Sequence, residues 1–265
     1  MKATDPYAAP KSVVADAPRD AGQDEYVPGG QRLSAGAGWD WFVEGWRLFM
    51  LQPGMWVAVI VVFALLVIVT SLVPFAGSIA TMLFSPVIGA GIMIGCRRLD
   101  EGGELEVAHL FAGFREKTGP LVAVGALYLA GWVALILAAL VLALLAGVGI
   151  GTLFSADTGK GAGAGIAAGA LLVLLLVLAL SIPLLMAVWF AAPLVVFHDQ
   201  GPAEAMKASF SGCMRNMLPM LVYGLVGLVL AIPATLLLML GWLALGPVFA
   251  GSIYASYRGI YTRRR

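Results

Sequence analysis

Charged residues are scarce in this chain of 265 residues. They make up 12% of the sequence against 61% hydrophobic residues, and the mean hydropathy is +0.94. Because a soluble domain carries about 25% charged residues, this composition excludes an ordinary soluble fold and indicates a membrane protein. The net charge of only +1 argues against a nucleic-acid partner, since neutralising a phosphate backbone requires a strongly basic surface.

Cysteine and histidine are equally rare, with two of each in the chain. Cys96 and Cys213 cannot build a disulfide framework. His109 and His198 each have a carboxylate nearby in the sequence, but two histidines without a cysteine pair at ligand spacing make a poor metal site. No serine stands in a nucleophile motif. We therefore expect no catalytic, cofactor-binding or metal-binding residue and no enzymatic activity.

The predicted membrane spans contain no Asp, Glu, Lys, Arg or His. Proton relays and ion-coupled carriers usually need such groups, so their absence argues against a proton-coupled pump. Hydroxyl groups could still line a transport path, and Ser85, Ser181, Thr235 and Ser252 are the candidates. The interpretation that we favour is that these hydroxyls bond to backbone carbonyls or to a neighbouring helix.

Apolar runs fill most of the chain after a polar start. Residues 1–35 have low hydrophobicity and no apolar signal-peptide segment, which predicts a disordered cytosolic tail before a transmembrane domain over residues 36–265. The fourth run would be about 50 Å long as a helix, more than the ~30 Å hydrocarbon core, so we expect tilt, a kink at Pro183 or extension into the periplasm. The six predicted spans, in three hairpins, cover residues 55–73, 76–95, 120–151, 164–197, 218–240 and 242–257.

A short polar segment with helical periodicity precedes each hairpin, and we call these three the leading segments. In the last of them, Pro202 suits the first position of a helix. We predict amphipathic helices in the cytosolic interface of the membrane. The apolar faces are predicted at Trp39, Phe42, Val43, Trp46, Phe49 and Met50, at Val107, Leu110, Phe111 and Phe114, and at Met206, Phe210, Cys213 and Met217.

The leading segments belong to an internal repeat. A glycine shortly before an arginine recurs at Gly45, Gly113 and Gly212. The second span of two hairpins also repeats, since Pro86 and Pro247 each stand eleven residues before an arginine. Such repeats can surround a transport pathway, or they can simply pack well, and we favour packing. The small-residue rows at Gly91 and Gly95 and at 161, 165 and 169 predict close helix packing within one bundle, with homo-oligomerisation as the alternative.

The basic residues are distributed very unevenly. With six spans, fifteen of the sixteen Lys and Arg residues lie on one side, and only Lys160 lies opposite. The positive-inside rule then places both termini in the cytosol. Some of these residues are candidates for contact with anionic lipid headgroups, although acting only as topology determinants is the simpler interpretation. The candidates are Arg97, Arg98, Arg115, Lys117, Arg215 and Arg258.

Three stretches carry a resemblance to a known family. They are WDWFVEGWRLFMLQP, RRLDEGGELEVAHLFAGFREKTGP and WFAAPLVVFHDQGPAEAMKASFSGCMRNMLP. Over about residues 36–260, the chain resembles a family of uncharacterised six-span inner-membrane proteins of Gram-negative bacteria. More distantly, it is similar to the membrane domain attached to some glycerophosphodiester phosphodiesterases. The resemblance implies an all-α polytopic fold and a bacterial inner-membrane location, and no functional residue.

Two function hypotheses follow. The first is a non-enzymatic scaffold or accessory protein that engages the lipid bilayer, a membrane-protein partner or a second copy of itself. The alternative is a transporter or lipid-moving protein with a path between the hairpins. A polar, enclosed cavity that reaches Ser85, Ser181 or Ser252 would favour transport, whereas tight apolar packing would favour the scaffold.

Overall fold

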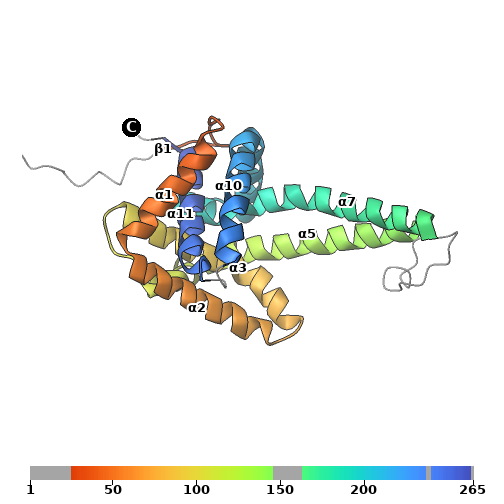
Figure 1. The fold of residues 1–265 in the computed structure, drawn as a ribbon, viewed down its shortest axis with the longest axis horizontal. Helices are drawn as coiled ribbons and strands as arrows, with labels where there is room; N and C mark the ends of the chain where they lie inside the picture. The colour runs from red at the N-terminus through yellow and green to blue at the C-terminus, as the bar shows by residue number, and fades with distance from the viewer. Residues whose placement is uncertain (1–24, 146–162, 237–239, 264–265) are drawn as a thin grey trace, which may run out of the picture.

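The computed structural model describes residues 25–145, 163–236 and 240–263. These residues form an almost entirely helical protein (Figure 1). In chain order the elements are β1 (Glu25–Tyr26), α1 (Ala37–Leu51), α2 (Pro53–Ser71), α3 (Ala76–Asp100), the 3-10 helix η1 (Val107–Phe111), α4 (Gly113–Glu116), α5 (Thr118–Leu145), α7 (Gly163–Trp189), α8 (Ala191–His198), α9 (Pro202–Arg215), α10 (Met217–Leu236), α11 (Trp242–Tyr261) and β2 (Thr262–Arg263).

Five helical stretches in the described parts are long and apolar enough to cross a membrane. They lie in α2, α3, α5, α7 with α8, and α10. Each coincides with a predicted span, so the predicted all-α, multi-pass membrane fold is confirmed. The sixth predicted span is the helix α11, which is not among the five. Its three tyrosines, its glycines and Arg258 lower its mean hydropathy.

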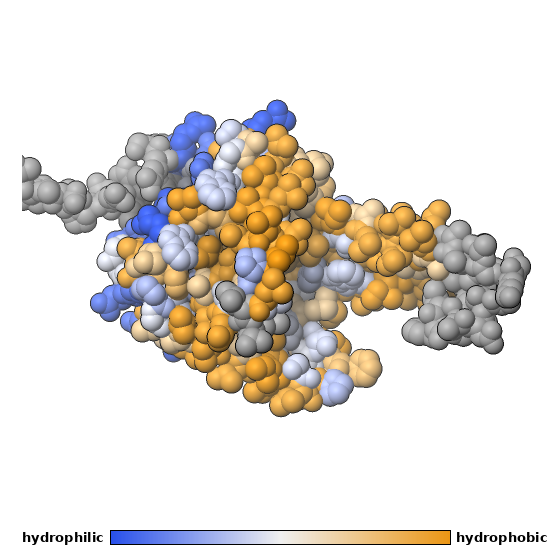
Figure 2. All heavy atoms as spheres, in the orientation of Figure 1, coloured by the Kyte–Doolittle hydropathy of each residue, from blue (hydrophilic) through white to orange (hydrophobic). Residues whose placement is uncertain are grey.

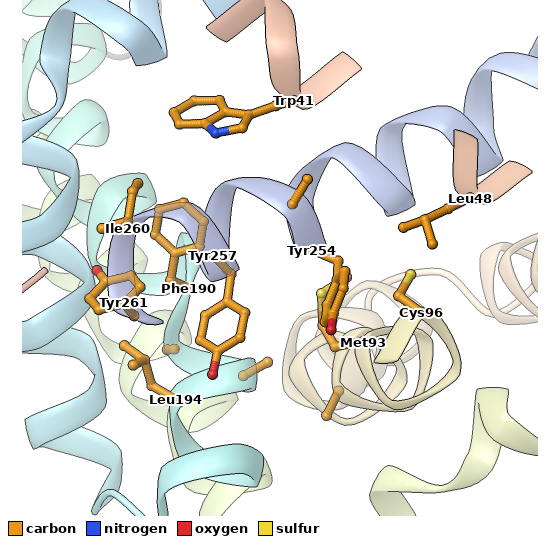
Figure 3. Close-up of a cluster of buried hydrophobic side chains, with 14 of the residues drawn as sticks. Trp41, Leu48, Met93, Cys96, Phe190, Leu194, Tyr254, Tyr257, Ile260 and Tyr261 are labelled. Carbon is orange, nitrogen blue, oxygen red and sulfur yellow. The ribbon is translucent and has the colours of Figure 1, made fainter. Parts of the chain in front are cut away.

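Helix α11 packs against other helices along much of its length. It packs most extensively on α1 and also contacts α2, α3 and α10. Figure 3 shows side chains of α1, α3 and the α7–α8 region gathered around Tyr254, Tyr257 and Tyr261 of α11. Both Ile260 and Tyr261 are fully buried. The hydrophobic core of the molecule therefore lies around the last turns of α11.

Three of the candidate spans expose most of their apolar surface. In the apolar 18-residue stretch that could cross the membrane, only 11% of α2, 11% of α5 and 6% of residues 169–198 is buried inside the protein. In Figure 2 hydrophobic atoms cover these helices, while hydrophilic atoms gather near α1 and the chain ends. Lipid tails are as apolar as these side chains, so such helices are stable only inside a bilayer.

The hairpins spread apart from a common body. Figure 1 shows α5 and α7 running side by side away from it, with α2 and α3 forming a second arm. Helices α10 and α11 run at a steep angle to α5 and α7. The helices of each predicted hairpin are in contact, in the pairs α2–α3, α5–α7 and α10–α11. Helix α11 nevertheless packs much more on α1 than on α10.

The leading segments close this arrangement into a ring. Helix α1 packs on α11, η1 and α4 pack on α3, and α9 packs on α7 and α8. Each leading segment thus lies against the second span of the hairpin before it, and α1 lies against the last one. In this way the first helix of the domain contacts the last, so the ring is complete only when the whole chain has folded.

The sequence repeat has a structural counterpart in this packing. A Cβ atom on Gly45 would overlap the carbonyl oxygen of Val248 and lie 2.8 Å from the nitrogen of Ser252. A Cβ atom on Gly113 would overlap the carbonyl oxygen of Val87. Val87 and Val248 both follow the repeated proline, so two copies of the repeat make the same close approach of helix backbones. This agrees with the favoured interpretation that the repeat serves packing.

The helix of the fourth predicted span is interrupted at Phe190, between α7 and α8. The Ser209 hydroxyl donates to the carbonyl of Met186 at 2.6 Å and accepts from the N–H of Phe190 at 2.9 Å. It therefore stands in for the helical bond between residues 186 and 190. A side chain inserted in this way is a known cause of helix kinks. Pro183 lies within α7, which continues past it.

The predicted apolar faces of the leading helices are only partly buried in the protein. In α1, Phe42 and Phe49 are buried, and Trp39, Val43, Trp46 and Met50 are more than half exposed, while Trp41 and Leu48 are buried. In α9 the buried residues are Ala205, Ser209, Gly212 and Cys213, whereas Phe210, and Met217 at the start of α10, are exposed. Small residues allow the backbones to approach closely, and the large side chains point to the lipid side.

Residues 25–35 belong to the folded domain, so the predicted boundary of the tail at residue 35 is wrong. Strand β1 pairs with β2 in antiparallel fashion, with Tyr26 opposite Thr262. The N–H of Leu33 donates to the side-chain oxygen of Asn216 at 2.8 Å, and the Asn216 amide donates to the carbonyl of Gln31 at 2.9 Å. Asn216 is fully buried. The rest of the predicted tail, residues 1–24, lies outside the described residues.

Candidate functional site: the charged end of the bundle

Four charged side chains form a network where three helices meet. Arg47 of α1 donates to Glu44 on the same helix at 2.7 Å and to Asp100, the last residue of α3, at 2.6 Å. Arg258 of α11 pairs with the other oxygen of Asp100 and lies 3.4 Å from Glu44. Two acids and two bases thus neutralise one another at the junction of α1, α3 and α11.

The network is partly withdrawn from solvent. The side chain of Asp100 is 11% exposed and that of Arg258 is 20% exposed, whereas Arg47 at 41% lies at the rim. The hydrogen bond to Glu44 raises the pKa of Arg47 above its ordinary value, so this guanidinium remains charged. An ion network in such a setting is sensitive to the loss of one member, because its partners are left without a counter-charge.

The six predicted headgroup contacts fall into two groups. Four of them already have partners in the protein. Arg258 belongs to the network described above, Arg97 pairs with Glu101 at 2.7 Å, and Lys117 pairs with Asp199. Arg215 donates to the carbonyl of Gly30 at 3.1 Å. Their main role in this structure is to hold helix ends and the 25–35 segment together.

Arg98 and Arg115 form the second group. Both are exposed, and within residues 25–145, 163–236 and 240–263 neither side chain makes a hydrogen bond or an ion pair. Their guanidinium donors are available to a ligand outside the protein. The prediction of headgroup contact is therefore best placed on these two residues.

The two histidines have structural partners. The Nε2 atom of His198 lies 2.5 Å from the hydroxyl of Tyr257, and its ring lies 4.2 Å from that of Tyr26. His109 accepts the backbone N–H of Glu106 at 3.0 Å through Nδ1, in a capping box at the start of η1. The described parts of the chain contain no group of three or more His, Cys, Asp or Glu residues that could hold a metal ion.

The hydroxyl groups at membrane depth are bonded inside the protein. Ser85, Ser181 and Thr235 donate to carbonyls of their own helices, at 3.2, 2.7 and 2.9 Å. Ser252 donates to the carbonyl of Phe249 at 2.8 Å, and its oxygen lies 2.8 Å from the hydroxyl of Tyr223. This confirms that the hydroxyls bond within the helices, as we expected.

The cysteines and the glycine row are also used for packing. Cys96 and Cys213 are free thiols that are fully buried. Burial raises the pKa of Cys213 to about 12, which keeps this thiol protonated and unreactive. A Cβ atom on Gly91 would overlap the carbonyl oxygen of His109, so this glycine packs inside the bundle. In the second glycine row, Gly161 lies outside the described residues, while Gly165 and Gly169 lie in the first turns of α7.

Sequence analysis missed the residues that connect these elements most directly. Asp100 and Glu44 join three helices, Ser209 interrupts a span, and Asn216 holds the 25–35 segment. Of these residues, the sequence could have indicated only Asn216, because a lone asparagine at the start of an apolar run needs hydrogen-bond partners when it is buried.

No protein-family model matches the chain, and no solved structure matches it. The chain is 31% identical over 251 residues to a "probable inner membrane protein" of Burkholderia thailandensis. The match covers 86% of this chain and 92% of the relative. Identity at this level over nearly the full length of both proteins agrees with the apolar spans of the fold. The chain therefore belongs to the same family of bacterial inner-membrane proteins.

Proposed function

We propose that this chain is a non-enzymatic scaffold or accessory protein of the inner membrane, which engages lipid or a membrane-protein partner through its basic cytosolic face. The observation that supports this proposal is that the candidate hydroxyl groups of the described spans form hydrogen bonds inside the protein. Within the described residues, the hydroxyls Ser85, Ser181 and Ser252 are bonded internally, and one buried side-chain atom, Oε1 of Gln200, has no partner.

Transport would require a different interior. A path for a polar solute needs polar groups that face the path, because a bilayer interior offers none. The cavity described at membrane depth lies between α2 and α3 and is lined almost entirely by apolar atoms. The apolar lining of this cavity favours contact with lipid over passage of a polar solute.

The proposed topology has six spans in three hairpins, with α11 as the sixth span and both termini in the cytosol. The pairing of β1 with β2 supports an even number of crossings, since it holds Tyr26 beside Thr262 at one end of the bundle. The charged network and the predicted headgroup contacts belong to the same end. The more distant likeness to the membrane domain of glycerophosphodiester phosphodiesterases stays a prediction, and we transfer no activity from it.

Site-specific photo-crosslinking in native membranes tests this function. A photoreactive amino acid at Arg98 or Arg115 is expected to give a discrete adduct with one membrane protein, with a second copy of the chain or with phospholipid. The same amino acid at Leu225, a lipid-facing residue of α10 that is 56% exposed, is the control and is expected to give lipid adducts only. Absence of any protein or lipid adduct specific to positions 98 and 115 would contradict the proposal.

A further inference from the structure

An apolar groove of about 340 Å³ lies between the two helices of the first hairpin. Phe63 and Leu66 of α2 line one wall, Phe84 and Ile88 of α3 line the other, and Phe111 and Phe114 close the end nearest the leading segment. The volume is within the range of about 300–1,000 Å³ that is typical of small-molecule sites. Because both walls are membrane spans, the groove lies at the depth of the lipid acyl chains.

The polar atoms in the groove walls are already bonded. The Thr70 hydroxyl donates to the carbonyl of Leu66 at 2.9 Å, that of Thr81 to Gly77 at 2.8 Å, and that of Ser85 to Met82 at 3.2 Å. A polar occupant would find few partners and would lose its hydration, which is unfavourable. The chemistry of the walls therefore selects a hydrocarbon chain.

A free positive charge lies next to the closed end of the groove. Arg115 follows Phe114 directly in the chain, is exposed, and has no ion-pair partner among the described residues. The Phe114 ring packs at 5.8 Å from that of Phe84 and so fixes α4 against the groove. An arginine beside an apolar slot complements a molecule with an anionic head and a hydrocarbon tail.

We propose that this groove is a phospholipid site, in which one acyl chain lies between α2 and α3 and an anionic headgroup binds Arg115. The site rests on the proposed engagement of lipid and specifies where it occurs and which lipid class is preferred. The bilayer supplies acyl chains along both walls. Arg115, the neighbour of the groove residue Phe114 in the chain, is expected to select an anionic lipid such as phosphatidylglycerol over zwitterionic phosphatidylethanolamine.

Gly89 provides a direct way to close the groove. It lies in the groove wall, and a Cβ atom there would have no heavy atom within 4 Å. We therefore expect a Gly89→Leu side chain, which starts from open space in the groove wall, to occupy the groove. Gly224 of α10 has equally open surroundings and lies outside the groove. Gly224→Leu is thus a matched control with the same added volume on another span.

The test uses the full chain in nanodiscs of phosphatidylethanolamine and phosphatidylglycerol, followed by native mass spectrometry after release. Wild type and Gly224→Leu are expected to retain one phospholipid, enriched in phosphatidylglycerol, and Gly89→Leu at least tenfold less. Arg115→Gln is expected to retain lipid without the phosphatidylglycerol enrichment. Equal retention by the two leucine variants would overturn the site and would identify the bound lipid as nonspecific.

A second measurement needs no substitution. Phosphatidylglycerol with a photoreactive group on its acyl chain is expected to label peptides covering residues 80–92 of the wild-type protein above those of α5, α7 and α10. Labelling in proportion to lipid exposure would overturn the proposal. Either failure leaves the expected adduct at position 98, which lies outside the proposed site, unaffected, so the site and the general function can fail separately.

Discussion

Asp100 shows how a single residue can hold several helices together. It ends α3, and its two carboxylate oxygens bind arginines from α1 and α11. A carboxylate with two guanidinium partners and 11% exposure is shielded from solvent and salt more than a surface ion pair is. The ring formed by the leading segments therefore has an electrostatic connection at the point where its first and last helices meet.

Asp100→Asn is expected to lower the free energy of unfolding by about 2 kcal/mol, because Arg258 loses its main counter-charge in a partly buried site. The measurement is the midpoint of unfolding in detergent. Glu101→Gln is the matched control. It removes only the exposed pair with Arg97, whose side chains are 29% and 45% exposed, and exposed pairs contribute about 0–1 kcal/mol. Equal shifts for the two variants would contradict a special role for Asp100.

At the scale of elements, the leading segments contribute more through close packing against other helices than through insertion into the membrane interface. Glycines lie on the buried faces of all three, together with alanine and serine in α9, while Trp39, Trp46 and Met50 of α1 are exposed. Without a hydrophobic driving force inside lipid, close van der Waals contact between backbones is the main gain when such helices associate. Gly45 and Gly113 make this contact at equivalent carbonyls of the repeat.

Gly45→Ala and Gly113→Ala are each expected to destabilise the protein by about 1–3 kcal/mol, since the added methyl group overlaps a backbone carbonyl that cannot move far. The control is Gly224→Ala, where nothing lies within 4 Å of the added atom. There alanine is expected to be neutral or to stabilise the helix by up to about 1 kcal/mol. Thermal unfolding in detergent measures all three, and a stabilising effect at Gly45 would refute the close packing.

The whole molecule combines a buried helix with arms that spread into lipid. Helix α11 is wrapped by α1, α2, α3 and α10, and the α5–α7 and α2–α3 arms diverge from this body (Figure 1). Among the residues coloured in Figure 2, the most hydrophilic gather around α1, and hydrophobic atoms cover much of both arms. This distribution suits a protein whose arms lie in lipid.

Reporter fusions test the orientation of the whole molecule. A fluorescent protein fused after Arg265 is expected to fluoresce, because both termini are proposed to lie in the cytosol. Alkaline phosphatase inserted after Gly161 is expected to be active, which requires the periplasm, and the same insertion after Arg98 is expected to be inactive. Phosphatase activity at the C-terminus would show an odd number of crossings and would reverse the proposed face.

The positions of the helices could be predicted from the sequence, but the contacts between them could not. The spans, the helix start at Pro202 and the repeat of Gly45 with Gly113 were readable because apolar length, proline and spacing act locally. Periodicity did not identify the buried faces of α1 and α9, because a large apolar side chain is equally stable against protein and against lipid. The predicted boundary at residue 35 failed since polar segments such as 25–35 order only through their partners.

The sequence alone determined that this chain is a membrane protein, because 61% hydrophobic residues, arranged in runs long enough to span a bilayer, would not be stable in water. Only the tertiary structure decided that α11 is the central helix, that Asp100 joins α1 and α11, and that α2 and α3 leave a groove beside Arg115. The physical reason is that partition into lipid depends on each segment by itself. Packing depends on which distant backbones and charges meet.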